Sequence, residues 1–263
     1  MYKLPVRLIV HPLLLRNHRS TLSPCYSPPE FVFPSLSRQH PQPSQVPMSL
    51  LHSPLLCIGI TGGIGSGKSY ICRQLEDAGH PVFYCDDEAK HIIRTDDEVK
   101  AALQQLVGPQ LYDAQGQLVK SILAAYLCKG RSYAAQVDAI VHPKVAQAFR
   151  TKAQQMADQL TSSSFTLSTS PLKLLNPKEE NCLTALKSLP THQVLFMECA
   201  LLFEANFQRF VDYSVLVHVS NETQINRLMM RDHITREKAL EWIALQLSEE
   251  EKLQRADAII YNE

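Results

Sequence analysis

Five short, continuously apolar runs recur along the chain, and each is long enough to form one strand. They are Leu55–Ile60, Pro81–Cys85, Val194–Met197, Tyr213–Val219 and Asp257–Tyr261. Strands that are apolar on both faces are typical of a parallel sheet that helices cover on either side. Between the runs, apolar residues recur three and four positions apart, which is the helical period. The pattern therefore predicts an α/β fold built on a parallel sheet.

The longest helical stretch lies between the second and third strands. Apolar spacing predicts helices over Asp97–Val107, Leu118–Cys128, Tyr133–Val141 and Pro143–Leu160. His142-Pro143 stands between the last two. Because Pro is common in the first turn of a helix, Pro143 is interpreted as the start of the second one. We therefore expect a helical insert at about 96–160. The Ser-, Thr- and Pro-rich segment 161–190 that follows is expected to be a surface loop.

Shorter helices are marked by their start and stop signals. Ser69–Ala78 is followed by Gly79, the residue type that commonly ends a helix. A second short helix is expected over Glu88–Ile93. Capping residues predict three more toward the C-terminus, opening at Asn221 (with Gln224 completing a capping box), at Thr235 (capping Glu237–Leu247) and at Ser248 (with Glu251).

Residues 1–54 differ from the rest in composition. They hold ten of the sixteen prolines, so we expect a disordered N-terminal extension ahead of one domain at 55–263. Its Arg-rich, acid-poor character is also that of a transit peptide, although the prolines would interrupt an amphipathic helix. Our preferred interpretation takes Met48 as the working start. No apolar run reaches the 18 residues of a membrane span.

Charge separates the two parts further. Residues 1–54 carry five basic side chains and one acidic one, which leaves 21 basic and 25 acidic residues in the remainder. A mildly acidic body argues against nucleic-acid binding. Seven scattered cysteines without a C-x-x-C pair favour reduced thiols in a cytoplasmic protein.

The first apolar run leads directly into the sequence G-x-x-x-x-G-K-S. Such a loop brings several backbone N–H groups within reach of phosphate oxygens, and its glycines allow both the close approach and the positive φ angles. The following helix directs its N-terminus at the same anion. We predict that Lys68 reaches the β/γ-phosphates, that the Ser69 hydroxyl ligates Mg²⁺, and that the nucleotide-binding residues are Gly63, Ile64, Gly65, Ser66, Gly67, Lys68, Ser69 and Tyr70.

Carboxylates follow two of the predicted strands. Asp86 comes after the second strand, where ligands gather in parallel sheets, so it is a candidate base for an attacking hydroxyl. The alternative for Asp86 or Asp87 is a helix N-cap. Glu198 follows four apolar residues. This is the position of a carboxylate that binds a water molecule on Mg²⁺, but a structural role for Glu198 is an equal alternative.

Three basic or titratable residues are further candidates. Arg227 and Arg231 lie four positions apart on one predicted helix, which suits a lid over a triphosphate; the alternative is two solvent-exposed arginines. His142 is either a capping or buried residue or a contact to the substrate.

These motifs together resemble dephospho-coenzyme A kinase. The matching pieces are Ile60–Ser69, Tyr84-Cys85-Asp86 with Ala89, Val141-His142-Pro143, Glu198–Glu204, Gln224 with Arg227–Asp232, Gln246, and Ala256–Asn262. They span 55–263 apart from the insert. The combination is far more specific than the phosphate loop alone.

The resemblance implies a three-layer fold like that of nucleoside monophosphate kinases, with a helical substrate-binding insert and a lid at about 224–247. It implies ATP-dependent phosphorylation of the 3′-hydroxyl of dephospho-coenzyme A, with Mg²⁺ as cofactor. The family's base corresponds to Asp86, while Tyr84 replaces an additional Asp of the family pattern. We assign catalysis to Asp86, Lys68 and Arg231, nucleotide contacts also to Arg227, and a substrate contact to His142. A monomer is expected. The family also continues past Asn262 with a final helix, whose loss is expected to expose apolar surface or weaken nucleotide binding.

Two other functions are compatible with the residue types. One is another small-metabolite or nucleotide kinase of the same fold, because the acceptor cannot be identified from residue types. The other is a nucleotide-binding module without turnover. A GTPase is disfavoured because the chain lacks an Asn-Lys-x-Asp motif.

Overall fold

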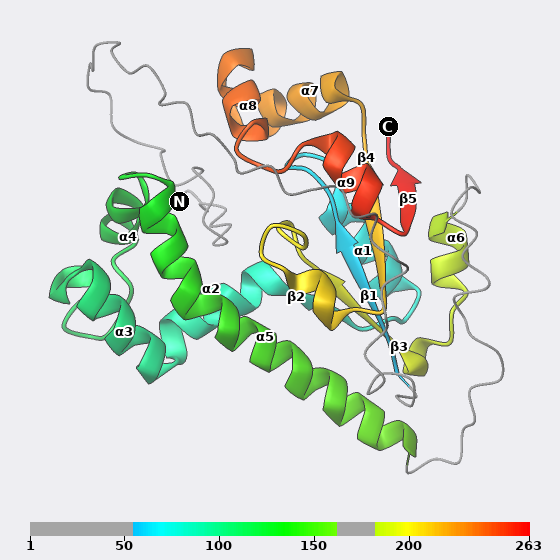
Figure 1. Ribbon diagram of the computed structural model, residues 1–263, viewed down its shortest axis with the longest axis horizontal. Helices are drawn as coiled ribbons and strands as arrows, with labels where there is room; N and C mark the ends of the chain where they lie inside the picture. The colour runs from blue at the N-terminus through cyan, green and yellow to red at the C-terminus, as the bar shows by residue number, and fades with distance from the viewer. Residues whose placement is uncertain (1–54, 162–181) are drawn as a thin grey trace, which may run out of the picture.

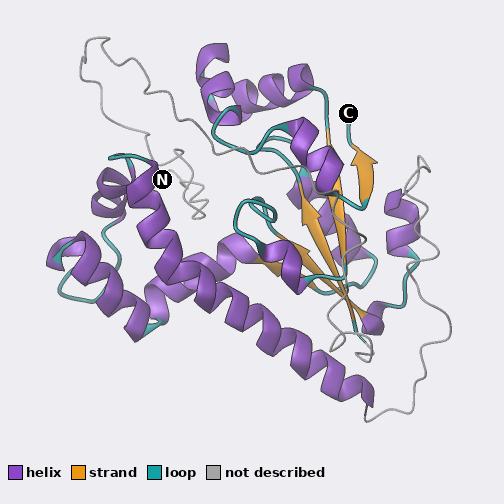
Figure 2. Ribbon diagram, viewed as in Figure 1, coloured by secondary structure: helices purple, strands orange, loops and turns teal. Residues whose placement is uncertain are grey.

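A five-stranded, all-parallel sheet forms the centre of the protein. The computed structural model describes residues 55–161 and 182–263, and its strands are ordered β2-β3-β1-β4-β5 (Figure 2). Their bounds are β1 Leu56–Thr61, β2 Val82–Tyr84, β3 Val194–Glu198, β4 Tyr213–His218 and β5 Ala258–Tyr261. The predicted parallel α/β sheet is confirmed, with each strand within two residues of its expected bounds.

Helices and short 3₁₀ segments connect the strands. The helices are α1 Lys68–Asp77, α2 Cys85–Thr95, α3 Asp97–Val107, α4 Lys120–Leu127, α5 Arg131–Thr161, α6 Cys182–Lys187, α7 Asn221–Asp232, α8 Arg236–Ile243 and α9 Glu249–Arg255. The 3₁₀ segments are η2 Pro109–Leu111, η4 Thr191–Gln193 and η5 Phe207–Phe210.

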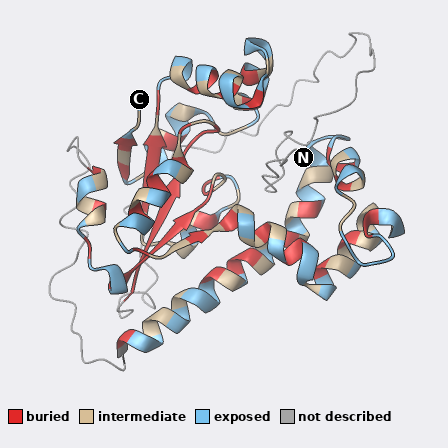
Figure 3. Cartoon of the chain, turned by 180° about the vertical axis from the view of Figure 1, so that it is seen from behind, coloured by how far each residue is buried: buried red, intermediate tan, exposed pale blue. Residues whose placement is uncertain are grey.

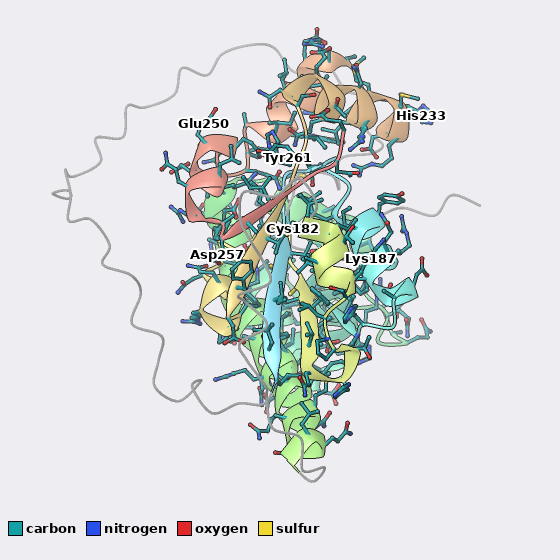
Figure 4. All side chains as sticks on the ribbon, turned by 90° about the vertical axis from the view of Figure 1, so that its right-hand side faces the viewer. Cys182, Lys187, His233, Glu250, Asp257 and Tyr261 are labelled. Carbon is teal, nitrogen blue, oxygen red and sulfur yellow. The ribbon has the colours of Figure 1, made fainter. Side chains whose placement is uncertain are left out.

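The two faces of the sheet carry separate apolar layers, because successive side chains on a strand point in opposite directions. On one face, Val194 and Phe196 pack with residues of α1 and α6. On the other, Leu195 and Met197 pack with α2, α5 and η5. Figure 3 shows the central strands β1 and β3 buried along their length, and Figure 4 shows α6, labelled at Cys182 and Lys187, lying against the sheet. The arrangement is the expected three-layer fold.

The predicted insert leaves the sheet through α2 and returns through α5. Figure 1 shows α3 and α4 set away from the sheet, beside the N-terminal half of α5. The prediction of two helices meeting at His142-Pro143 is wrong, because α5 runs unbroken through Pro143. Pro143 removes one backbone hydrogen bond, at a cost of roughly 3 kcal/mol in a helix interior. Burial of Val141, Val145 and Phe149 on either side of it offsets that cost.

The start of α2 also differs from the expectation. The helix begins at Cys85 rather than Glu88, and Tyr84 occupies the N-cap position without a side-chain cap. Asp86 and Asp87 therefore lie inside the first helical turn, and neither is the N-cap. Their negative charge there still complements the positive end of the helix dipole.

Two further expectations are corrected near the C-terminal half. Cys182–Lys187 is helix α6, not part of a surface loop, and residue 161 is the last of α5, while 188–190 lie outside helix and strand as expected. The predictions for 162–181 and 1–54 lie outside the described residues. The cap of α7 is Ser220, whose Oγ accepts from the Thr223 N–H, one residue before the expected Asn221. The caps at Thr235 and Ser248 are confirmed. None of the helices within 55–161 and 182–263 is long and apolar enough to cross a membrane.

Candidate active site

The phosphate-loop motif forms a tight turn between β1 and α1. Gly67 is the N-cap of α1 with a φ of 92°, and Gly65 has a φ of 84°, conformations that glycine adopts without strain. A Cβ on Gly62 would overlap the carbonyl oxygen of Val217 on the neighbouring strand. Glycine is therefore needed at these positions both for backbone conformation and for packing.

The loop leaves a set of backbone donors at the N-terminus of α1. The N–H groups of Gly65, Gly67 and Ser69 donate to no residue in the part of the chain that the structure describes. By contrast, the Ile64 N–H donates to Oε1 of Gln246 at 2.7 Å, and the Tyr70 N–H donates to the Gly67 carbonyl at 2.9 Å. The unbonded N–H groups of Gly65, Gly67 and Ser69 lie at the positive end of the helix dipole, an arrangement suited to binding an anion.

Lys68 is folded back over this turn. Its Nζ donates to the carbonyls of Gly62 at 2.8 Å and Gly63 at 3.0 Å, and the side chain is only 2% exposed. The pKa of the Cys72 thiol reports its surroundings: burial raises that pKa, the Glu198 charge raises it further, and the Lys68 charge lowers it. Lys68 and Glu198 are thus both close enough to act on one buried sulfur.

Two carboxylates lie at the carboxyl edge of the sheet. Glu198 ends β3, is level with Ile60 of β1 and Tyr84 of β2, and is 5% exposed. Asp86 follows β2 by two residues, and its Oδ1 is buried. The pKa of Cys85 is raised by a hydrogen bond with Cys199 and by burial, and then by the charges of Glu198 and Asp86. Both carboxylates therefore lie near the same buried thiol.

The next carboxylate along the chain is placed differently. Asp87 is exposed and accepts a hydrogen bond from Lys90 Nζ at 2.7 Å. Of the two adjacent aspartates, Asp86 is therefore the one turned toward the sheet edge.

The two arginines that we predicted to lie on a lid have different partners. Arg227 Nη2 donates to the Asn262 carbonyl at 2.8 Å, and its Nη1 donates to the Ser66 carbonyl at 3.4 Å. Arg231 donates from Nε and Nη2 to Oδ2 of the buried Asp232, at 3.0 and 2.6 Å. The structure therefore brings Arg227 to the phosphate loop, while Arg231 is held by its neighbour.

His142 lines a separate cavity of about 590 Å³ between α5 and residues 205–210. Its Nε2 lies 3.3 Å from Oδ1 of Asp138, and its ring meets Phe207 edge-on with centroids 5.7 Å apart. Because His142 is in the middle of α5, the capping alternative is wrong. Four alanines complete much of the wall, which keeps the cavity open.

Two arginines stand at this cavity. The guanidinium carbons of Arg209 and Arg150 lie 4.7 and 5.7 Å from the ring centroid of Phe210, so the aromatic ring holds both cations. Neither arginine forms an ion pair with a residue of 55–161 or 182–263. The cavity therefore offers an aromatic face and two positive charges.

A family model for dephospho-CoA kinase matches residues 56–183 and 172–263. The chain belongs to the dephospho-CoA kinase family. A dephospho-CoA kinase of Bacteroides fragilis is 34% identical over 206 residues, covering 78% of this chain and 84% of the relative. One from Geobacillus kaustophilus is 30% identical over 207 residues, covering 79% and 88%.

Solved structures agree with the fold of the family. TT1252 from Thermus thermophilus superposes with a TM-score of 0.56 at 25% identity, covering 80% of this chain and 89% of that one. Dephospho-CoA kinase from Campylobacter jejuni gives 0.50 at 19% identity, covering 78% and 87%, and its likeness is one of fold.

The donor chemistry of the site is compatible with the magnesium ion that a kinase of this family implies. The oxygens of Ser69, Asp86 and Glu198 are hard ligands of the type that Mg²⁺ prefers. Within the described residues, no group of three or more His, Cys, Asp or Glu side chains is arranged to hold a metal.

The sequence reasoning missed the roles of three amide residues. Gln224 and Gln246 bind the backbone of Ile64, and Nδ2 of Asn262 donates to the Ser66 carbonyl at 2.8 Å. From the sequence we expected Gln224 to complete a capping box, which is wrong because its amide binds Ile64; Gln246 and Asn262 were only parts of the family pattern. The available signal was Gln224 on the apolar face of a helix, since a buried amide there requires a partner.

Proposed function

We propose that this dephospho-CoA kinase family member transfers the γ-phosphoryl group of ATP to the 3′-hydroxyl of dephospho-CoA, giving CoA and ADP. The observation that carries the proposal is the amide-lined turn at the start of α1, which lies at the same sheet edge as the inward-facing Asp86. Phosphoryl transfer needs positioning and charge stabilisation more than covalent chemistry, and these groups supply both.

The nucleotide phosphates are proposed to lie on the N–H groups of Gly65, Gly67 and Ser69. Lys68 is expected to exchange its two carbonyl partners for phosphate oxygens, because those carbonyls belong to the same loop that carries the phosphate-binding N–H groups. Ser69, half-buried in the first turn of α1, would ligate Mg²⁺, whose charge supports that of Lys68 on the β- and γ-phosphates.

Asp86 is proposed to accept the proton of the 3′-hydroxyl as that oxygen attacks the γ-phosphorus. Its first-turn position on α2 fixes the carboxylate at the sheet edge, and burial of Oδ1 limits competing water. Arg227 already contacts the loop. Arg231, one helical turn further, is proposed to leave Asp232 and neutralise charge on the transferring group.

The cavity beside His142 is the proposed place for the acceptor. Dephospho-CoA carries an adenine ring and a diphosphate, and the cavity offers Phe210 with Arg150 and Arg209. α5, which carries His142, packs against α2, which carries Asp86. The monomeric state and cytoplasmic location expected from the sequence stay predictions.

The test is acceptor-dependent ADP formation by the full chain. Purified protein is incubated with ATP and Mg²⁺ alone, with dephospho-CoA, and with nucleoside monophosphates or sugars. We expect ADP to form with dephospho-CoA, with CoA produced in equal amount, and little ADP elsewhere. Equal or faster turnover with a nucleoside monophosphate or a sugar would assign a different acceptor, and no acceptor-dependent ADP would contradict catalysis.

A further inference from the structure

Residues that lie outside the phosphate loop bind its backbone from the side opposite the free amides. Gln224 Nε2, on α7, donates to the Ile64 carbonyl at 2.6 Å. Asn262 Nδ2, after β5, donates to the Ser66 carbonyl at 2.8 Å. Gln246, between α8 and α9, instead accepts the Ile64 N–H at 2.7 Å. The partners fix these roles, because a carbonyl can only accept and an N–H can only donate.

The side chain of Ile64 holds this arrangement in place. It is buried in a small apolar cluster with Ile225 and Leu228 of α7 and Trp242 of α8. Gln224 is itself 5% exposed, so its amide has few alternative partners and no bulk water to replace a lost one. The loop is thus attached to α7 and α8 by apolar packing and by directed hydrogen bonds together.

Peptide geometry connects these outward bonds to the inward donors. In a trans peptide the C=O of one residue and the N–H of the next point in opposite directions. The Ile64 carbonyl shares a peptide with the Gly65 N–H, and the Ser66 carbonyl shares one with the Gly67 N–H. Those two N–H groups are among the three without an acceptor in the described residues. Holding each carbonyl outward therefore turns the next N–H inward.

We propose that Gln224 and Asn262 are positioning residues for ATP, each orienting one phosphate-binding amide, of Gly65 and Gly67 respectively. Glycine peptides rotate easily, and a flipped peptide would present a carbonyl oxygen to the phosphate. The two side-chain amides make that flip unfavourable before nucleotide arrives. The inference rests on the proposed function only in taking the loop as the nucleotide site.

The test compares variants that add the same charge but differ in hydrogen bonding. Gln224→Glu and Asn262→Asp lose the donor, whereas Gln246→Glu keeps an acceptor for the Ile64 N–H. We expect kcat/KM for ATP and the association constant for ADP to fall at least tenfold further in the first two than in Gln246→Glu. The KM for dephospho-CoA should change by less than about twofold, which a general loss of structure would not produce.

ADP binding is measured by calorimetry and folding by thermal unfolding, so that a loss of nucleotide binding can be distinguished from a loss of folding. Equal losses in Gln224→Glu and Gln246→Glu, or a parallel rise in the KM for dephospho-CoA, would overturn the proposal. If Gln224→Glu does not fold, the test uses Gln224→Met, which removes the donor without adding charge, together with Asn262→Asp. If wild type binds ADP but makes no CoA, calorimetry still tests the positioning role while the proposed reaction fails.

Discussion

The phosphate loop and the cavity beside His142 are built in opposite ways. Around the loop, the carbonyls of Gly62, Gly63, Ile64 and Ser66 all accept hydrogen bonds from residues of the protein. At the cavity, small alanines leave space and the two arginines have only Phe210 as a described partner for their charge. At the loop the carbonyls are bonded within the protein and N–H donors remain for a ligand, whereas at the cavity two positive charges remain.

The difference indicates which features of the protein control nucleotide binding and which control acceptor binding. A loop whose Ile64 and Ser66 carbonyls are bonded presents fixed amides, so we expect phosphate binding to need little rearrangement beyond the movement of Lys68. A cavity with uncommitted cations gains most when an anion arrives, because a charge-assisted hydrogen bond is among the stronger polar contacts. Nucleotide binding should therefore respond to loop geometry, and acceptor binding to individual charges.

The largest effect is expected at Asp86, the proposed base, on the helix α2 that packs against the cavity helix α5. Asp86→Asn should lower kcat by roughly 10²-fold or more, the scale of a lost general base, with little change in the KM for ATP. Steady-state kinetics with both substrates measure this. Asp87→Asn is the matched control, because that carboxylate is exposed and paired with Lys90, and it should stay within about twofold of wild type. Wild-type turnover in Asp86→Asn would remove Asp86 from the role.

A smaller, one-sided effect is expected at the cavity. Arg209→Gln and Arg150→Gln should each raise the KM for dephospho-CoA about tenfold, the scale of one lost charge-assisted bond, and leave the KM for ATP unchanged. Lys152→Gln, exposed on α5 two residues from Arg150, removes the same charge away from the cavity lining. A rise in the KM for ATP in the arginine variants would mean that the cavity is not an acceptor site separate from the nucleotide.

The smallest effect is expected at a residue that belongs to neither region. Asp96 caps α3 by accepting the Val99 N–H, and that bond, helped by Lys144, lowers the pKa of Asp96. Asp96→Ala should reduce the free energy of unfolding by about 1 kcal/mol and leave both KM values unchanged. Urea unfolding at pH 7 measures the loss.

The pH dependence of that loss has a definite sign. Because the folded-state pKa lies below 3.8, the carboxylate contributes its full stability above that value and loses it as pH falls through the lower, folded pKa. The difference between wild type and Asp96→Ala should therefore shrink only in strong acid. A difference that instead grew on acidification would contradict the capping role.

The sheet and the phosphate loop were predictable because their signals are local. Five apolar runs marked the strands, and the loop is eight consecutive residues whose glycines are needed for conformation and packing. The continuity of α5 was not predictable, because burial of Val145 and Phe149 against other elements outweighs the signal of Pro143. Periodicity alone carries no information about that packing energy.

The candidate site was predictable only in part for the same reason. Asp86, Lys68 and Ser69 follow from the ends of strands and from a motif. Residues that approach from a distance do not: Asn262 reaches Ser66 across 196 positions, and Arg150 of α5 reaches Phe210 of η5 through a fold that no short pattern encodes.

The unbroken course of α5 has a mechanical consequence. At 31 residues and about 1.5 Å per residue, it is a continuous helix of roughly 46 Å that connects the outlying α3–α4 pair to the sheet without a break. Any tilt of that pair relative to the sheet must therefore bend α5. Bending is easiest where one backbone hydrogen bond is already absent, at Pro143, beside the histidine of the cavity that we propose for the acceptor.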